Sequence, residues 1–159
     1  MSLTSYTIDR TYAVPPERLF QAFTDPTDLA AWVWGADAPG VTAEVDLRVG
    51  GLVEMAMRMP DPEGGESIAG FRGMYVAIEE PHRLVHTVHW DASVGYNAPG
   101  MHPIDEVLIA EIAPYENGCR LQYTHLGIPD DGLSAPEHER SVRATLDVLA
   151  LHLGVPSAG

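Results

Sequence analysis

Residues 134–154 read SAPEHERSVRATLDVLALHLG, and this stretch decides the fold. Its apolar residues recur at spacings of four, three and four and so share one helical face: Val142, Leu146, Leu149 and Leu153. Ser134 and Glu137 have the spacing of a capping box, and Gly154 supplies a stop. The pattern predicts an amphipathic helix of about 19 residues, roughly 28 Å long, which can lie across a sheet of six or seven strands.

The chain before this helix is rich in strand patterns. Residues 4–12 alternate with a period of two, and from residue 41 onward short apolar runs are separated by Gly, Pro and Asp. The expected strands are 4–12, 41–49, 52–59, 68–79, 82–90, 104–113 and 119–126. A longer connection is expected over 91–103. Because short turns join most neighbours, the strands should pair antiparallel.

Two short helices are expected between the first two strands. Pro16 opens one of them, whose apolar stripe is Leu19, Phe20 and Phe23. Asp25 caps the next, Pro26 takes its first position, and its buried side is Leu29, Trp32 and Val33. The order of elements predicts a single α+β domain, 1–159, with the helix-grip fold: a curved antiparallel sheet wrapped around a long C-terminal helix. A fold of this kind can enclose an apolar cavity.

The charge of the chain excludes several functions. The sequence of 159 residues carries 23 acidic residues, nine arginines and no lysine, and its formal net charge is -14. Such a field repels phosphate, so we expect neither nucleic acid nor an anionic membrane as a partner. Without lysine there is no internal Schiff base and no phosphate-binding loop of the Gly-Lys-Ser/Thr kind.

The single cysteine, Cys119, excludes an intramolecular disulfide and a Cys-x-x-Cys redox pair, and it fits a reducing cytoplasm best. The first six residues lack the pattern of a secretory signal, and no apolar window of about 18 residues exists. We therefore expect a cytoplasmic protein that does not insert into membranes.

Several motifs resemble one known superfamily. The opening of that superfamily is similar to three segments of this chain: RTYAVPPERLF at 10–20, FTDP at 23–26 and LAAW at 29–32. Three later motifs follow in the same order as in the superfamily: GMY at 73–75, PHRLV at 81–85 and NGCRL at 117–121. The chain resembles the START-like (SRPBCC) superfamily, and within it the branch called activator-of-heat-shock-protein-ATPase-homologue-like. The resemblance implies a helix-grip fold. It also implies a range of functions: lipid carriage, hormone binding, polyketide cyclisation or stimulation of a heat-shock ATPase.

Three positions depart from that family. Its members often have Gly-Trp early in the last helix, where this chain has Ser141 and Val142, and often a second aromatic residue after Trp32, where this chain has Val33. The smaller side chains either leave more room inside the domain or are compensated by other residues.

The strand 52–59 places Met55, Met57 and Met59 on the side without charge. Methionine is flexible and polarizable, so these side chains suit either an adaptable ligand pocket or a packed core. Tryptophan and tyrosine can line such a pocket and orient a ligand through their polar atoms, whereas Trp32 also fits a structural anchor. The ligand-binding candidates are Met55, Met57, Trp90, Tyr123, His125, Trp32 and Tyr75.

The histidines do not predict a metal site. His86 and His89 face opposite sides of a regular strand, and a three-ligand site would have to be assembled from distant elements. We therefore expect no metal and no cofactor. His125 shares the parity of Tyr123 on the concave face, where it is either a hydrogen-bonded core residue or a ligand contact and general base.

The carboxylates and the first arginine are also ambiguous. Asp105 and Glu106 stand at a strand end, where solvated carboxylates are usual. Arg10 shares the parity of Ile8 and Tyr12, so an inward position would require a carboxylate partner or a ligand anion, and an outward position would require nothing.

The leading hypothesis is that the chain binds a small hydrophobic molecule between the sheet and the last helix. One alternative is a cyclase or hydrolase acting on an aromatic or polyketide-like substrate, with His125 as a proton shuttle and the catalytic residues otherwise unassigned. Another is a co-chaperone-like module that stimulates a heat-shock ATPase, which follows from the family resemblance alone. An exposed edge strand would permit a homodimer.

Overall fold

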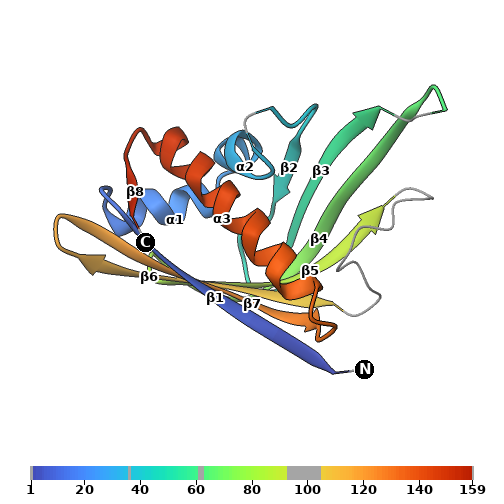
Figure 1. The fold of residues 1–159 in the computed structure, drawn as a ribbon. Helices are drawn as coiled ribbons and strands as arrows, with labels where there is room; N and C mark the ends of the chain where they lie inside the picture. Colours follow the sequence, from blue (N-terminus) through green and yellow to red (C-terminus); the bar gives the residue numbers. More distant parts are fainter. Residues whose placement is uncertain (1, 36, 61–62, 93–104, 159) are drawn as a thin grey trace.

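The computed structural model describes residues 2–35, 37–60, 63–92 and 105–158, and within them the chain forms strands, two short helices and a long C-terminal helix (Figure 1). The elements in chain order are β1 (Leu3–Tyr12), α1 (Pro16–Thr24), α2 (Pro26–Trp32), β2 (Thr42–Val45), β3 (Leu52–Pro60), β4 (Glu66–Glu79), β5 (Arg83–Ala92), β6 (Glu106–Tyr115), β7 (Gly118–Pro129), α3 (Ser134–Leu153) and β8 (Ser157–Ala158). The connection expected over 91–103 falls largely outside the described residues.

The strands form one antiparallel sheet in the order β2-β3-β4-β5-β6-β7-β1-β8. The sheet curves around α3, and α1 and α2 lie near one end of that helix (Figure 1). This confirms the expected α+β helix-grip fold. The two-residue β8, which follows α3 and pairs with Thr11 and Tyr12, was not expected from the sequence because so short a strand carries no pattern.

Two glycines in β4 allow the neighbouring backbones to approach closely. A Cβ atom on Gly70 would lie 2.1 Å from the Met55 carbonyl oxygen, and one on Gly73 would lie 1.7 Å from the Thr87 carbonyl oxygen. The β4 and β5 register shifts just beyond Gly73, between Tyr75 and Ala77. Glycine at these positions therefore permits the bend that turns the sheet into a grip.

The predicted apolar face of α3 packs against the sheet. Leu146 and Leu149 are fully buried, as is Ile8 on β1. Tyr12 donates its hydroxyl to the Leu146 carbonyl oxygen at 3.2 Å, which ties the helix to the first strand. The burial of this face is the main source of the helix's stability.

The start of α3 differs from the predicted capping box. Asp131, not Ser134, accepts the hydrogen bonds there: its carboxylate receives the Leu133 and Ser134 backbone N–H groups at 2.9 and 2.7 Å and the Ser134 hydroxyl at 2.7 Å. These hydrogen bonds lower the pKa of Asp131 to about 2. The prediction failed because it considered only Ser134, whereas Asp131, three residues earlier, is also a residue type that caps helices, and the turn geometry favours it.

The other end of α3 is joined to the two short helices through Asp28. Arg18 on α1 donates to both Asp28 carboxylate oxygens, at 2.8 and 3.0 Å, and the His152 Nε2 of α3 lies 2.5 Å from one of them. The cap predicted at Asp25 is present, since its carboxylate accepts from Thr27 and Asp28 at 2.9 and 3.0 Å. One carboxylate thus links three helices.

Arg10 points inward, which the sequence left open. Its side chain is buried, and its Nη1 lies 2.5 Å from Asp147 on α3, which supplies the carboxylate partner that an inward arginine requires.

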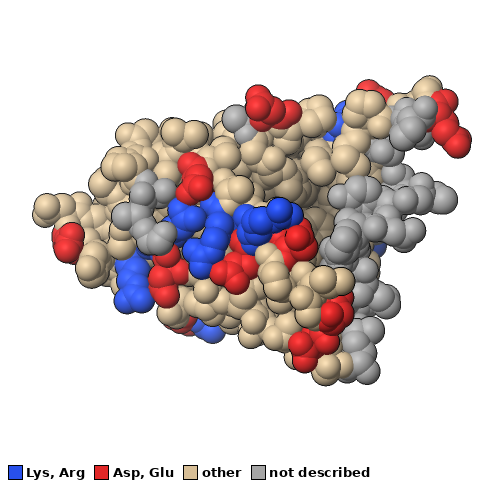
Figure 2. Space-filling model, viewed as in Figure 1, with Lys and Arg blue, Asp and Glu red and all other residues tan. Residues whose placement is uncertain are grey.

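Figure 2 shows that arginine and acidic side chains are interspersed in the centre of the face formed by α3 and β1, so this face presents no continuous basic patch. Among the described residues, no helix has the length and apolarity needed to cross a membrane.

Candidate functional site

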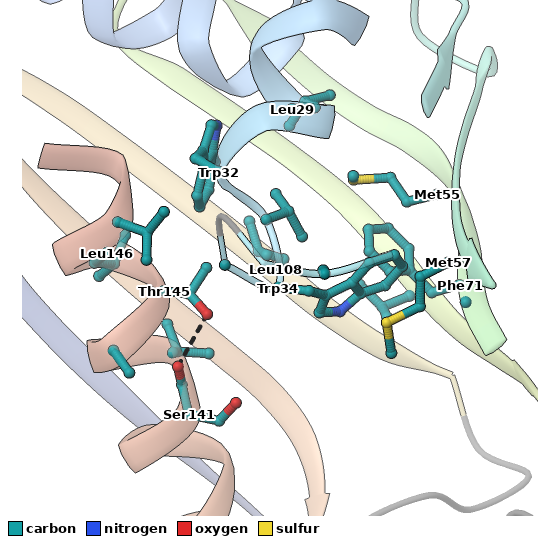
Figure 3. Close-up of a pocket in the computed structure, with 18 of the residues that line it drawn as sticks. Leu29, Trp32, Trp34, Met55, Met57, Phe71, Leu108, Ser141, Thr145 and Leu146 are labelled. Atoms are coloured by element: carbon teal, nitrogen blue, oxygen red, sulfur yellow. Dashed lines mark hydrogen bonds between the residues drawn. The ribbon is translucent and has the colours of Figure 1, made fainter. Parts of the chain in front are cut away.

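A cavity of about 1030 Å³ lies between α3, the short helix α2 and the concave face of the sheet. Its walls come from α2 and the segment after it, from strands β3 to β7, and from one side of α3. In Figure 3, Leu29, Trp32 and Met55 line one part of the cavity, while Ser141 and Thr145 of α3 face it from the opposite side. A volume of this size is typical of sites for small organic molecules.

Several aromatic side chains belong to the cavity wall, and Figure 3 labels three of them, Trp32, Trp34 and Phe71. The rings of Trp34 and Phe71 meet edge to face at 6.1 Å between centroids, and Phe71 and Trp90 do so at 5.6 Å. Trp34 has a positive φ of 67°, which a bulky residue rarely adopts. Such backbone strain often occurs at functional sites, and here it accompanies an indole that lies against the cavity.

The methionine pattern of β3 places two thioethers at the cavity. Met55 is fully buried and Met57 is half-buried, and both line the cavity, whereas Met59 is not part of the lining. Met57 and Trp34 both belong to the lining, and both are labelled in Figure 3. Flexible side chains of this kind can adjust the shape of the apolar wall to a guest.

The polar end of the cavity contains a buried hydrogen-bonded chain. Glu106 of β6 is fully buried, and its Oε2 lies 2.5 Å from His125 Nε2. The same oxygen accepts the Trp90 indole N–H at 3.1 Å. On its other side, His125 Nδ1 lies 3.0 Å from the Tyr6 hydroxyl. Both ring nitrogens of His125 therefore contact protein groups, so a proton transfer between His125 and a guest would require one of these hydrogen bonds to break.

Three further polar groups lie near this chain. The His138 ring of α3 is 5.4 Å from the His125 ring between centroids. Burial, with a smaller contribution from Glu106, raises the pKa of Tyr123 well above its ordinary value, so its hydroxyl stays protonated. Burial also lowers the pKa of His86 to about 4, and His86 is neutral at pH 7. The cavity is thus apolar over most of its wall, and the neutral side chains of Tyr123 and His86 belong to its polar part.

Of the seven residues predicted to bind a ligand, six line this cavity: Met55, Met57, Trp90, Tyr123, His125 and Trp32. Trp32 has a structural contact as well, because its indole N–H donates to the Ala22 carbonyl oxygen at 2.8 Å. Tyr75 does not belong to the lining. It is fully buried behind the wall, where its ring meets His86 edge to face at 5.8 Å.

Sequence reasoning missed Glu106, which was expected to be solvated. The signal was present, since Glu106 has the same parity along β6 as Leu108, Ala110 and Ile112, all of which face inward. His138 was missed although it lies four residues before Val142 on the apolar side of α3. Both residues occupy positions that the periodicity of β6 or of α3 turns toward the interior. Their polar side chains were the only reason to expect them to be exposed.

The three family departures all fall on the cavity wall. Val33, Ser141 and Val142 line it, so the small side chains at these positions border open volume in this chain.

Three solved structures that cover nearly all of the chain are similar to it. A protein from Rhizobium loti has a TM-score of 0.72 and 27% identity, over 95% of this chain and 97% of that one. A protein from Chromobacterium violaceum has a TM-score of 0.71 and 28% identity, over 92% and 94%. An HSP90 activator from Plasmodium falciparum has a TM-score of 0.69 and 27% identity, over 97% and 99%.

No curated protein sequence matches the chain. A family match covers residues 13–154, from just after β1 to the end of α3, and thus includes the helices, strands β2 to β7 and the residues that line the cavity. The match agrees with the resemblance expected from the opening motifs and with the likeness to an HSP90 activator. The chain therefore belongs to the family described as Activator of Hsp90 ATPase homolog 1-like protein.

Proposed function

We propose that this protein binds a small hydrophobic molecule in the cavity between α3 and the sheet. The observation that carries the proposal is the cavity itself, with a volume of about 1030 Å³ and a wall built mainly from apolar and aromatic side chains. Moving an apolar guest from water to such a wall is favourable by roughly 25 cal/mol for each Å² of apolar surface buried. The flexible Met55 and Met57 side chains allow the wall to fit guests of different shapes.

The cavity also favours one arrangement of the guest. An aromatic or aliphatic body fits against Trp34, Phe71 and Met57, where it gains edge-to-face and sulfur contacts. A single hydrogen-bonding group on the guest would then lie toward Tyr123 and the α3 side of the cavity. A strongly charged guest is disfavoured, because the described lining is mainly apolar and burying an unpaired charge is costly.

A residue exchange on α3 tests this proposal. Ser141 lines the cavity from an otherwise exposed helix position, so in Ser141→Trp the indole can enter the cavity without disturbing the core. We expect its affinity for the neutral dye Nile red to fall about 10-fold or more, which corresponds to about 1.4 kcal/mol. Fluorescence titration of the purified chain measures this.

The matched control is Arg140→Trp, on the neighbouring residue of the same helix. The Arg140 side chain is 77% exposed and is not part of the lining, so this variant adds the same ring outside the cavity. It should bind Nile red as the wild type does. Equal binding by Ser141→Trp, or no binding by the wild-type chain, would contradict the proposal.

A second candidate function is stimulation of a heat-shock ATPase. It is supported by the family and by the 27% identity to an HSP90 activator from Plasmodium falciparum. An increase in the ATP hydrolysis rate of purified Hsp90 on addition of this chain would support it, and an unchanged rate would count against it. The Ser141→Trp and Arg140→Trp variants would show in the same assay whether the cavity takes part.

A further inference from the structure

We propose that Glu106, His125 and His138 bind a single divalent transition-metal ion, for which Zn²⁺ is the probe, at the polar end of the cavity. The inference does not depend on the binding of an apolar guest. It concerns three side chains from three elements: β6, β7 and α3.

The three side chains have the ligand types and the proximity that such an ion requires. One carboxylate oxygen and one nitrogen from each histidine lie within 4.8 Å of one another. Two histidines and one glutamate form the ligand set of many zinc sites that keep an open position, and a related set of two histidines and one carboxylate binds non-haem iron. The sequence argued against a metal because the candidate ligands are far apart in the chain. The fold brings residues 106, 125 and 138 together.

The surroundings of the ligands match what metal sites need around them. A histidine ligand is usually oriented by a hydrogen bond at its other ring nitrogen, and the Tyr6 hydroxyl lies 3.0 Å from His125 Nδ1. In the tautomer that coordinates through Nε2, the Nδ1–H group donates to this hydroxyl. The carboxylate is also held, since the Trp90 indole N–H donates to Glu106 Oε2. Both groups are therefore positioned by neighbours.

The short contact between two of the ligands points to the place of the ion. His125 Nε2 and Glu106 Oε2 lie 2.5 Å apart, a separation at which a proton must stand between them. A divalent cation can replace this proton. Zinc ligands at 2.0–2.2 Å in tetrahedral geometry lie about 3.3 Å from one another, so the two atoms need to separate by less than about 1 Å. Rotation of the two side chains would have to supply that movement.

The proposed site opens toward the cavity. His125 and His138 both belong to the cavity lining, whereas Glu106 lies behind it. With three protein ligands, the remaining coordination position faces the cavity and is available to water or to an oxygen or nitrogen atom of a guest. The site would therefore prefer a guest with a carbonyl or hydroxyl group at one end.

Zinc titration of the metal-free chain tests the inference, by calorimetry and by the metal-induced change in melting temperature. We expect the wild-type chain to bind one Zn²⁺ and to melt at a higher temperature with it. His138→Gln should bind it about 10-fold or more weakly, and Tyr6→Phe should weaken binding by about 10-fold through the orientation of His125. Co²⁺ in place of Zn²⁺ should give a visible absorption band that His138→Gln loses.

The control is His89→Gln. His89 forms an exposed pair with Asp105, at 2.6 Å, so this variant removes a histidine beside a carboxylate outside the cavity. It should bind Zn²⁺ as the wild type does. Glu106 is fully buried, so Glu106→Gln is informative only if this variant folds. His138 is half-buried, so the test with His138→Gln does not depend on the folding of Glu106→Gln. Absent binding by the wild type, or equal affinity in wild type and His138→Gln, would overturn the inference and leave a hydrogen-bonded core network.

Discussion

Replacement of Gly73 by alanine is expected to lower the free energy of unfolding by about 3 kcal/mol, the upper part of the usual range for overpacking. The added Cβ would lie 1.7 Å from the Thr87 carbonyl oxygen, and its nearest neighbours are backbone atoms that no rotamer change can move away. The β4 and β5 strands would have to separate close to the register shift between Tyr75 and Ala77. For a domain of this size the melting temperature should fall by about 6–12 °C.

Thermal and urea unfolding of Gly73→Ala measure this loss. The control is Met74→Ala, because Met74 is the next residue of β4 and its side chain is half exposed. This variant should stay within about 0.5 kcal/mol of the wild type. If Gly73→Ala unfolds at the same temperature as Met74→Ala, the close approach of the two backbones does not shape the sheet.

Replacement of Asp28 by asparagine is expected to cost about 2–3 kcal/mol, because charge-assisted hydrogen bonds contribute more than neutral ones. The asparagine keeps the shape of the side chain but cannot accept from Arg18 with both atoms. It also loses the charge that attracts His152. Arg18 and His152 come from α1 and α3, so the variant weakens the connection of three helices next to Leu29, which lines the cavity.

The same exchange should change how stability depends on pH. Burial by itself would raise the pKa of Asp28, but the hydrogen bonds from Arg18 and His152 outweigh it and lower the pKa. A lowered pKa means that this carboxylate contributes stability above the unfolded-state value of about 3.9, and that the contribution is lost as the pH falls through the lower folded-state value. The Asp28→Asn variant should lack this part of the acid-induced loss.

Melting temperatures measured from neutral pH down to acid pH check both effects. Asp46→Asn is the control, since Asp46 pairs with Arg48 at 2.8 Å but both side chains are more than half exposed. An exposed ion pair contributes at most about 1 kcal/mol. A loss in Asp28→Asn no larger than in Asp46→Asn would show that the three-helix link contributes little.

Much of the fold could be predicted from local patterns. The α3 helix follows from the spacing of Val142, Leu146 and Leu149, and the strands follow from short apolar runs between turn residues. These patterns are reliable because each element must bury one face, and the period of the apolar residues reports which face that is. The inward side of β3, with Met55 and Met57, was predicted in the same way.

The candidate site was predicted only in part. Met55, Trp90 and His125 were expected near a cavity, and they line one. Glu106 was expected in solvent, because a carboxylate at a strand end usually is, yet it is fully buried against His125. A buried carboxyl group is tolerated only when its hydrogen-bond partners are in place, and these partners come from other strands.

The sequence by itself determined the order of the elements, the inward face of each, and the acidic, lysine-free composition that excludes whole classes of chemistry. Only the tertiary structure decided that Arg10 turns inward to Asp147, that Asp28 joins three helices, and that Glu106, His125 and His138 meet. The reason is physical. Periodicity is a property of neighbouring residues, whereas the pairing of polar groups depends on which distant elements the packed core brings within a few ångströms.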